Sequence, residues 1–146
     1  MKFELDVYRE LLNIPDGEIR RKLEVNSTEE RPGVRYEGIQ DVTDLYNPGV
    51  LPAHVYVRDG RAQMVYIPSG AAIEGLTTDE LEAELGGEGT RLRSRAGKKF
   101  NHYVHPDKGV AYSSDTRHVR FIEVFPPCSL ESYKEDIYRE PPTFKR

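Results

Sequence analysis

The clearest hydrophobic pattern lies at residues 53–67, where apolar and polar side chains alternate on either side of Asp59 and Gly60. Such alternation is typical of half-buried strands, and an Asp-Gly pair supplies the positive backbone angles of a two-residue hairpin turn. The pattern therefore predicts a β-hairpin over this segment. A regular register places six side chains on one apolar, core-facing side: Ala53, Val55, Val57, Ala62, Met64 and Tyr66.

Apolar side chains recur at helical spacing in four further places. The predicted helices lie near residues 4–13, 17–25, 78–85 and 130–139. The third helix has the best-marked ends, because Thr77 and Glu80 can form a capping box and Gly86 can adopt a left-handed conformation. Asp16 and Ser129 are expected to cap the second and fourth helices.

A second run of strands follows Thr90. The predicted strands cover residues 91–95, 100–105, 110–113 and 118–125, with short polar turns between them. They predict a meander over residues 90–125. Its last strand becomes apolar on both sides toward Phe125, which indicates a central place in the sheet.

The N-terminal half has weaker signals. Residues 26–33 are expected to be a polar loop, and residues 34–40 an edge strand that could pair across a homodimer. Residues 43–52 contain two prolines and are expected to be an irregular connection. Together, the strands and short helices predict an α+β fold built on a largely antiparallel sheet, in a single globular domain over residues 1–146.

Composition excludes several classes of protein. Cys128 is the only cysteine, so an intrachain disulfide is excluded and a reducing, cytoplasmic location is expected. No apolar run reaches the roughly 18 residues of a membrane span, so no membrane association is expected. A net charge of -4 argues against nucleic acid as a general partner.

One stretch departs from this acidic balance. Residues 91–105 contain five Lys and Arg residues and no acidic residue, which leaves 16 basic against 25 acidic residues in the rest of the chain. Arg91, Arg93 and Arg95 alternate, so on a strand they would project from one side about 6.6 Å apart. Guanidinium groups bind carboxylates and phosphates bidentately, so this row of arginines predicts an anion-binding surface.

The register of the predicted 91–105 hairpin is open. A loop of two or four residues places His102 opposite Arg93, whereas a three-residue loop brings Asn101 and Tyr103 onto the arginine side. The predicted ligand-binding residues are Arg91, Arg93, Arg95, Lys98, Lys99, Asn101, His102 and Tyr103. They lead us to expect a non-enzymatic module that binds a partner protein or a small anionic ligand.

The histidines support an alternative function. His102 and His118 could act as acid and base in a small hydrolase or nuclease for phosphodiesters, with Lys99 and Arg93 stabilising the developing charge. His102 and His105 are three positions apart on a predicted strand, so they are expected on opposite sides and not as a metal-chelating pair. His54 is expected to be a half-exposed strand residue. The sequence predicts neither a metal site nor a cofactor.

Overall fold

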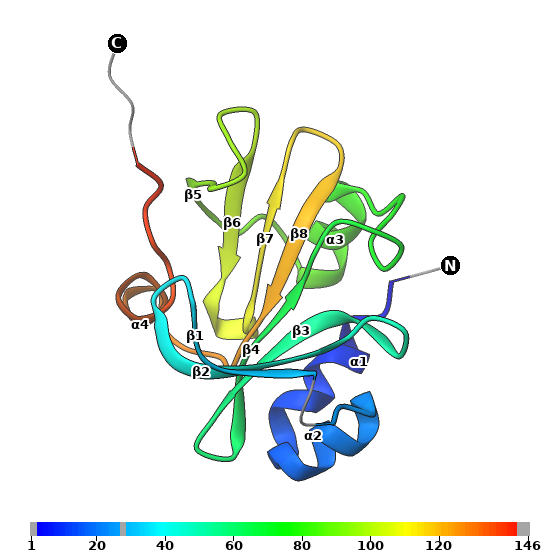
Figure 1. Ribbon diagram of the computed structural model, residues 1–146. Coiled ribbons are helices and arrows are strands. Elements are labelled where there is room, and N and C mark those ends of the chain that lie inside the picture. The colour runs from blue at the N-terminus through cyan, green and yellow to red at the C-terminus, as the bar shows by residue number, and fades with distance from the viewer. Residues whose placement is uncertain (1–2, 27–28, 143–146) are drawn as a thin grey trace.

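The computed structural model describes residues 3–26 and 29–142, and its centre is an antiparallel sheet of eight strands (Figure 1). The strands are β1 (Glu30–Tyr36), β2 (Ile39–Asn47), β3 (Leu51–Arg58), β4 (Arg61–Ile67), β5 (Thr90–Arg93), β6 (Asn101–His105), β7 (Val110–Ser114) and β8 (Val119–Val124). Their order across the sheet is β1-β2-β3-β4-β8-β7-β6-β5. Two meanders therefore join where β4 pairs with β8. The predicted α+β fold, the C-terminal meander and the central place of its last strand are confirmed.

Short helices pack on both faces of the sheet (Figure 1). They are α1 (Leu5–Arg9), the 3-10 helix η1 (Glu10–Asn13), α2 (Asp16–Leu23), α3 (Thr78–Leu85), the 3-10 helix η2 (Pro106–Lys108) and α4 (Leu130–Asp136). Leu5, Ile19 and Leu81, from α1, α2 and α3, belong to one hydrophobic core. Tyr133 of α4 packs with Phe125 in a second core. Within the described part of the chain, no helix is both long and apolar enough to cross a membrane.

The ends of α3 and α4 follow the predicted motifs. The Thr77 hydroxyl accepts a hydrogen bond from the backbone N–H of Glu80, and the Glu80 carboxylate accepts one from the backbone N–H of Thr77, which completes the capping box. Gly86 ends α3 in the left-handed conformation, with a φ of 83°. Ser129 caps α4 through its hydroxyl. These three local predictions are confirmed.

The predicted cap of α2 was wrong. Pro15 occupies the N-cap position, and Asp16 is already the first residue of the helix. The Asp16 carboxylate binds the Arg20 guanidinium at 2.9 Å, one turn further along the helix. An ion pair across one turn has therefore replaced the predicted bond to the backbone.

The first three strands also differ from the predictions. β1 begins at Glu30, inside the predicted loop, of which residues 27–28 lie outside the described residues. The predicted strand at residues 34–40 is divided by a turn at Glu37 and Gly38. The segment at residues 43–52 is mostly strand, because one proline lies in the turn between β2 and β3 and the other near the beginning of β3. β1 is an edge strand, and pairing across a homodimer stays a prediction.

The β3–β4 hairpin contains a bulge that the regular register did not predict. Val57 pairs with Ala62 as expected, but the next pair is Tyr56 with Met64. A slip of one residue turns the following side chains to the other side of the sheet. Met64 and Tyr66 consequently leave the predicted core face and pack in the second core, beside α4.

Candidate functional site

The predicted basic hairpin forms between β5 and β6, but its first strand is shorter than expected. Arg93 pairs with Asn101 and Arg91 with Tyr103, which is the register of the three-residue-loop alternative. However, β5 ends at Arg93. Arg95 therefore lies in the connecting loop, so the predicted row of three arginines on one strand was wrong.

Arg95 turns back over the sheet. Its guanidinium carbon lies 4.3 Å from the centre of the Phe121 ring, and 5.1 Å and 5.6 Å from the rings of Tyr36 and Tyr66. Its Nη1 donates to the Glu123 carboxylate at 3.2 Å, and its Nη2 donates to the Tyr36 hydroxyl at 2.7 Å. Cation–π contacts and a charge-assisted hydrogen bond thus hold this side chain, of which 29% is exposed.

Glu123, on β8, is the centre of a buried polar cluster and is only 1% exposed. Its Oε1 accepts a hydrogen bond from the Tyr133 hydroxyl at 2.5 Å, and its Oε2 accepts from the Tyr36 hydroxyl and from Arg95. The Nε2 of His102 lies 3.5 Å from Oε1. We call Tyr36, Arg95, His102, Glu123 and Tyr133 the Glu123 cluster. It joins β1, β6, β8, α4 and the 94–100 loop.

The cluster holds Glu123 in its ionised form. Burial would raise the pKa of Glu123, but the contacts with His102, Arg95 and Tyr133 outweigh it and lower the pKa to about 2. Burial and the charge of Glu123 raise the pKa of Tyr36 and of Tyr133. At neutral pH both hydroxyls therefore remain protonated donors around a buried carboxylate.

His102 is 3% exposed and is hydrogen-bonded at both ring nitrogens. Its Nε2 lies 2.6 Å from the Tyr133 hydroxyl, and its Nδ1 lies 2.9 Å from the Ser113 hydroxyl. Because the only Tyr133 hydroxyl proton is donated to Glu123, Nε2 of His102 donates to the Tyr133 oxygen. Both nitrogens are therefore occupied inside the protein.

His118 lies in a different part of the sheet. It is exposed and forms an isolated bridge with Thr77. His102 pairs with Ser113, which pairs with Phe121, three residues beyond His118. Two strand spacings and three residues along a strand correspond to about 14 Å between the Cα atoms of the two histidines. The structure does not bring the predicted acid and base together.

The two remaining histidines contact aromatic rings. The His105 ring lies 6.0 Å from that of Tyr112, in the core on the opposite face of β6 from the Glu123 cluster, as predicted. His54 is half-buried, with its Nδ1 3.0 Å from Asp44 and its ring stacked on Tyr46 at 3.7 Å. No cluster of three or more potential metal-ligating side chains occurs within residues 3–26 and 29–142.

A pocket of about 510 Å³ adjoins the Glu123 cluster, between the 94–100 loop and the segment that follows α4. We call it the basic pocket. Its lining comprises Arg93, Ser94, Arg95, Gly97, Lys98, Phe100, Asn101, Pro141 and Pro142. It thus brings together four of the predicted ligand-binding residues: Arg93, Arg95, Lys98 and Asn101.

The other four predicted ligand-binding residues are not in the lining of this pocket. His102 belongs to the Glu123 cluster. The Tyr103 ring packs against Tyr112 at 5.4 Å, on the opposite side of the sheet. Arg91 and Lys99 are exposed. The basic stretch is therefore divided among the basic pocket, the Glu123 cluster, the opposite side of the sheet and the exposed surface.

One arginine of the basic pocket is already paired with an acid of the chain itself. Nη1 of Arg93 lies 3.1 Å from the Glu140 carboxylate, and the Tyr138 hydroxyl donates to the Arg93 carbonyl at 2.8 Å. The Arg93 and Glu140 side chains are 49% and 70% exposed, so this ion pair contributes little to stability. Lys98 has no acidic partner within the described residues.

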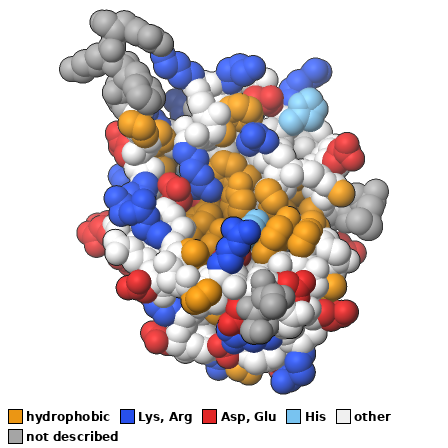
Figure 2. Space-filling model, viewed as in Figure 1, with side chains coloured by type: hydrophobic (Ala, Val, Ile, Leu, Met, Phe, Trp, Pro, Cys, Tyr) orange, Lys and Arg blue, Asp and Glu red, His pale blue; other side chains and the backbone are white. Residues whose placement is uncertain are grey.

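Aromatic side chains surround the Glu123 cluster on its face of the sheet. The Tyr36 ring contacts those of Tyr56 and Tyr66, and Tyr66 contacts Phe121 at 5.6 Å. Figure 2 shows hydrophobic side chains gathered over the middle of the molecule, with Lys and Arg side chains near them. On the face shown, Lys and Arg side chains therefore lie beside an apolar surface.

Tyr36, Glu123 and Tyr133 were not among the predicted site residues. The only sequence signal for Glu123 is an acidic residue on the otherwise apolar side of a central strand. A buried charge needs partners, so such a position indicates a polar cluster but does not identify its other members. Comparison with known proteins adds no identification, since no family model, no curated protein and no solved structure matches this chain.

Proposed function

We propose that this protein is a binding module whose basic pocket holds a ligand with a carboxylate or phosphate group beside an apolar group. The observation that carries the proposal is the contact between Arg93 and Glu140, because it places a carboxylate at 3.1 Å from a guanidinium at the pocket. A ligand anion in this position would replace a weak, exposed ion pair.

The lining of the pocket supports both parts of such a ligand. Arg93, Lys98 and Asn101 provide hydrogen-bond donors, two of them cationic, for an anion. Phe100 and Pro141 provide apolar surface for the attached group. The Glu123 cluster holds Arg95, and Arg95 belongs to the loop that forms one wall of the pocket.

The alternative hydrolase or nuclease has weaker support. Both nitrogens of His102 are hydrogen-bonded in a buried site, and His118 is exposed just before the first residue of β8. A general base needs to come within hydrogen-bond reach of the proton that it removes. A cytoplasmic location stays a prediction from the sequence.

Titration with phenyl phosphate and benzoate tests the proposal. We expect saturable amide chemical-shift changes in residues 93–101 and 138–142. The affinity should fall when NaCl is raised from about 20 to about 300 mM, because salt screens exposed charges. Benzyl alcohol, which has the ring without the anion, is expected to cause much smaller changes.

Two matched variants sharpen this test. Lys98→Ala should weaken phenyl phosphate binding about threefold or more, whereas Arg61→Ala, an exposed position at the beginning of β4, should change it less than about 1.5-fold. Equal binding by both variants, or equal shifts with benzyl alcohol, contradicts the proposal.

A further inference from the structure

The segment just before the basic stretch has the opposite charge. Residues 62–90 contain no Lys or Arg. The acidic residues of this segment are Glu74, Asp79, Glu80, Glu82, Glu84 and Glu88. From Glu74 onward, the crossover from β4 to β5, which includes α3, therefore carries only negative charges.

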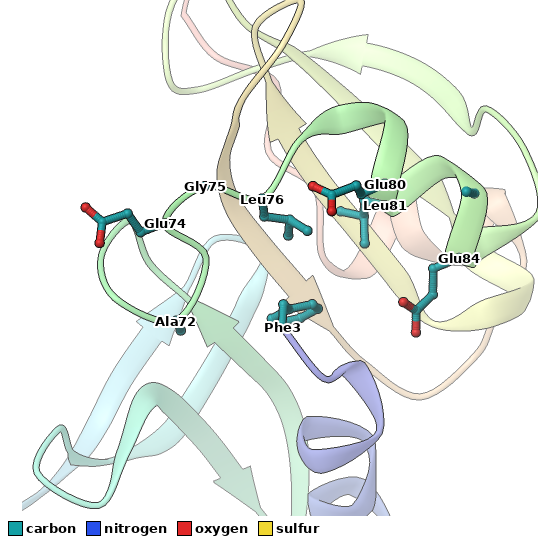
Figure 3. Close-up of a pocket in the computed structure, with 9 residues that line it drawn as sticks. Phe3, Ala72, Glu74, Gly75, Leu76, Glu80, Leu81 and Glu84 are labelled. Atoms are coloured by element: carbon teal, nitrogen blue, oxygen red, sulfur yellow. The ribbon is translucent and has the colours of Figure 1, made fainter. Parts of the chain in front are cut away.

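A groove of about 480 Å³ lies between α3 and the 72–76 loop. Figure 3 shows Phe3, Leu76 and Leu81 gathered in its middle, contributed by the N-terminal segment, the loop and α3. Phe3 and Leu76 remain partly exposed. The groove therefore presents apolar surface that a bound side chain would cover.

Carboxylates lie on two sides of this apolar surface. Glu74 projects from the loop, and Glu80 and Glu84 lie one helical turn apart on α3 (Figure 3). No basic residue is part of the lining. Glu74 and Glu84 are exposed and form no ion pair with any described residue.

We infer that this acidic groove binds a short segment of a partner protein in which an apolar side chain is flanked by lysines or arginines. An apolar side chain would cover Phe3 and Leu76, while cations on either side of it would reach Glu74 on the loop and Glu84 on α3. A single ammonium group could serve only one side of the groove, so a peptide with several cations fits better. This inference is independent of the function proposed for the basic pocket.

Fluorescence anisotropy with three labelled seven-residue peptides tests the inference. One peptide alternates Lys with Leu and has Phe at its centre, the second has Ser in place of every apolar residue, and the third has Glu in place of every Lys. We expect saturable binding of the first peptide only. Amide shifts on binding should be largest in residues 72–85. Equal binding of the first two peptides would show attraction by charge alone and would overturn the proposal.

Substitutions of exposed carboxylates identify the site without endangering the fold. The double variant Glu74→Gln with Glu84→Gln should weaken binding of the Lys/Leu/Phe peptide about fivefold, since exposed charge pairs each contribute up to about 1 kcal/mol. The matched control, Glu131→Gln with Glu135→Gln on α4, also removes two exposed charges. It should change binding less than about 1.5-fold. Equal effects of the two double variants would overturn the proposal.

Discussion

The acidic segment at residues 62–90 and the basic stretch at residues 91–105 are neighbours in the chain, but the structure uses their charges differently. The acidic side chains that line the groove beside α3 are exposed at the protein surface. In the basic stretch, Arg95 is paired with the buried Glu123, and Arg93 is paired with Glu140. A concentration of charge in the sequence therefore does not tell which charges are available to a ligand.

The difference arises from partners far away in the chain. Arg95 and Glu123 are 28 residues apart, and Arg93 and Glu140 are 47 residues apart. Lys98 lines the basic pocket together with both arginines, and it has no acidic partner within the described residues. We therefore expect Arg95 to stabilise the fold, and we expect the proposed ligand to contact Arg93 and Lys98.

The largest expected effect comes from removing the buried carboxylate. Glu123→Ala would leave Arg95 without its anion and the hydroxyls of Tyr36 and Tyr133 without their acceptor. Breaking an ion pair whose carboxylate is buried costs about 3–5 kcal/mol. Thermal and urea denaturation should show this loss in the free energy of unfolding. Glu131→Gln, at an exposed site on α4, serves as the control and should change it by less than about 0.5 kcal/mol. If the Glu123 variant unfolds like the control, the cluster is not what holds the two parts of the sheet and α4 together.

Acid should weaken the same cluster. The pKa of Glu123 is lowered from 4.5 to about 2 on folding, so its contribution is complete above about pH 5 and is lost as the pH falls through this range. The lost contribution amounts to roughly 3 kcal/mol. Urea unfolding at pH 5.5 and at successively lower pH checks this, and a carboxyl-carbon NMR titration of Glu123 gives its pKa directly. A midpoint near 4.5 would contradict the described contacts.

Arg95 and Arg91 provide the sharpest comparison within the basic stretch. Arg95→Ala should destabilise the protein by about 2 kcal/mol, because it removes the cation beside Glu123 from a site that is partly open to solvent. Arg91→Ala removes an exposed charge and should have an effect of less than about 0.5 kcal/mol. Similar free energies of unfolding for the two variants would contradict a stabilising role that is specific to Arg95.

The smallest effect on stability is expected for Glu140→Gln. Its ion pair with Arg93 is exposed, so its loss should change the free energy of unfolding by less than about 0.5 kcal/mol. Phenyl phosphate should nevertheless bind about twofold more tightly, because the carboxylate that competes for Arg93 has been removed. Weaker binding by this variant would contradict competition for Arg93.

These contrasts also show which features the sequence could predict. The capping box of α3 and the Ser129 cap of α4 depend on residues within one helical turn, so the local pattern was sufficient. The Glu123 cluster depends on Tyr36, 87 residues before Glu123, and on Tyr133, ten residues after it. No local pattern connects these positions.

Two local irregularities of the strands explain why Tyr66 and Arg95 lie elsewhere than predicted. The bulge in the β3–β4 hairpin moved Tyr66 from the predicted core face to the face of the Glu123 cluster. The early end of β5 at Arg93 released Arg95 into the loop. Neither feature changes the alternation of residues, so the periodicity of the sequence could not reveal them.

A ¹⁵N NMR titration with phenyl phosphate, followed at the guanidinium signals, is the most direct test. It shows which arginines of the basic stretch contact the ligand. We expect the Nε–Hε signal of Arg93 to move saturably, while the signals of Arg91 and of the cluster-bound Arg95 move little. Equal movement of all three signals, or movement of Arg91 without Arg93, would contradict this division and would favour a continuous row of arginines.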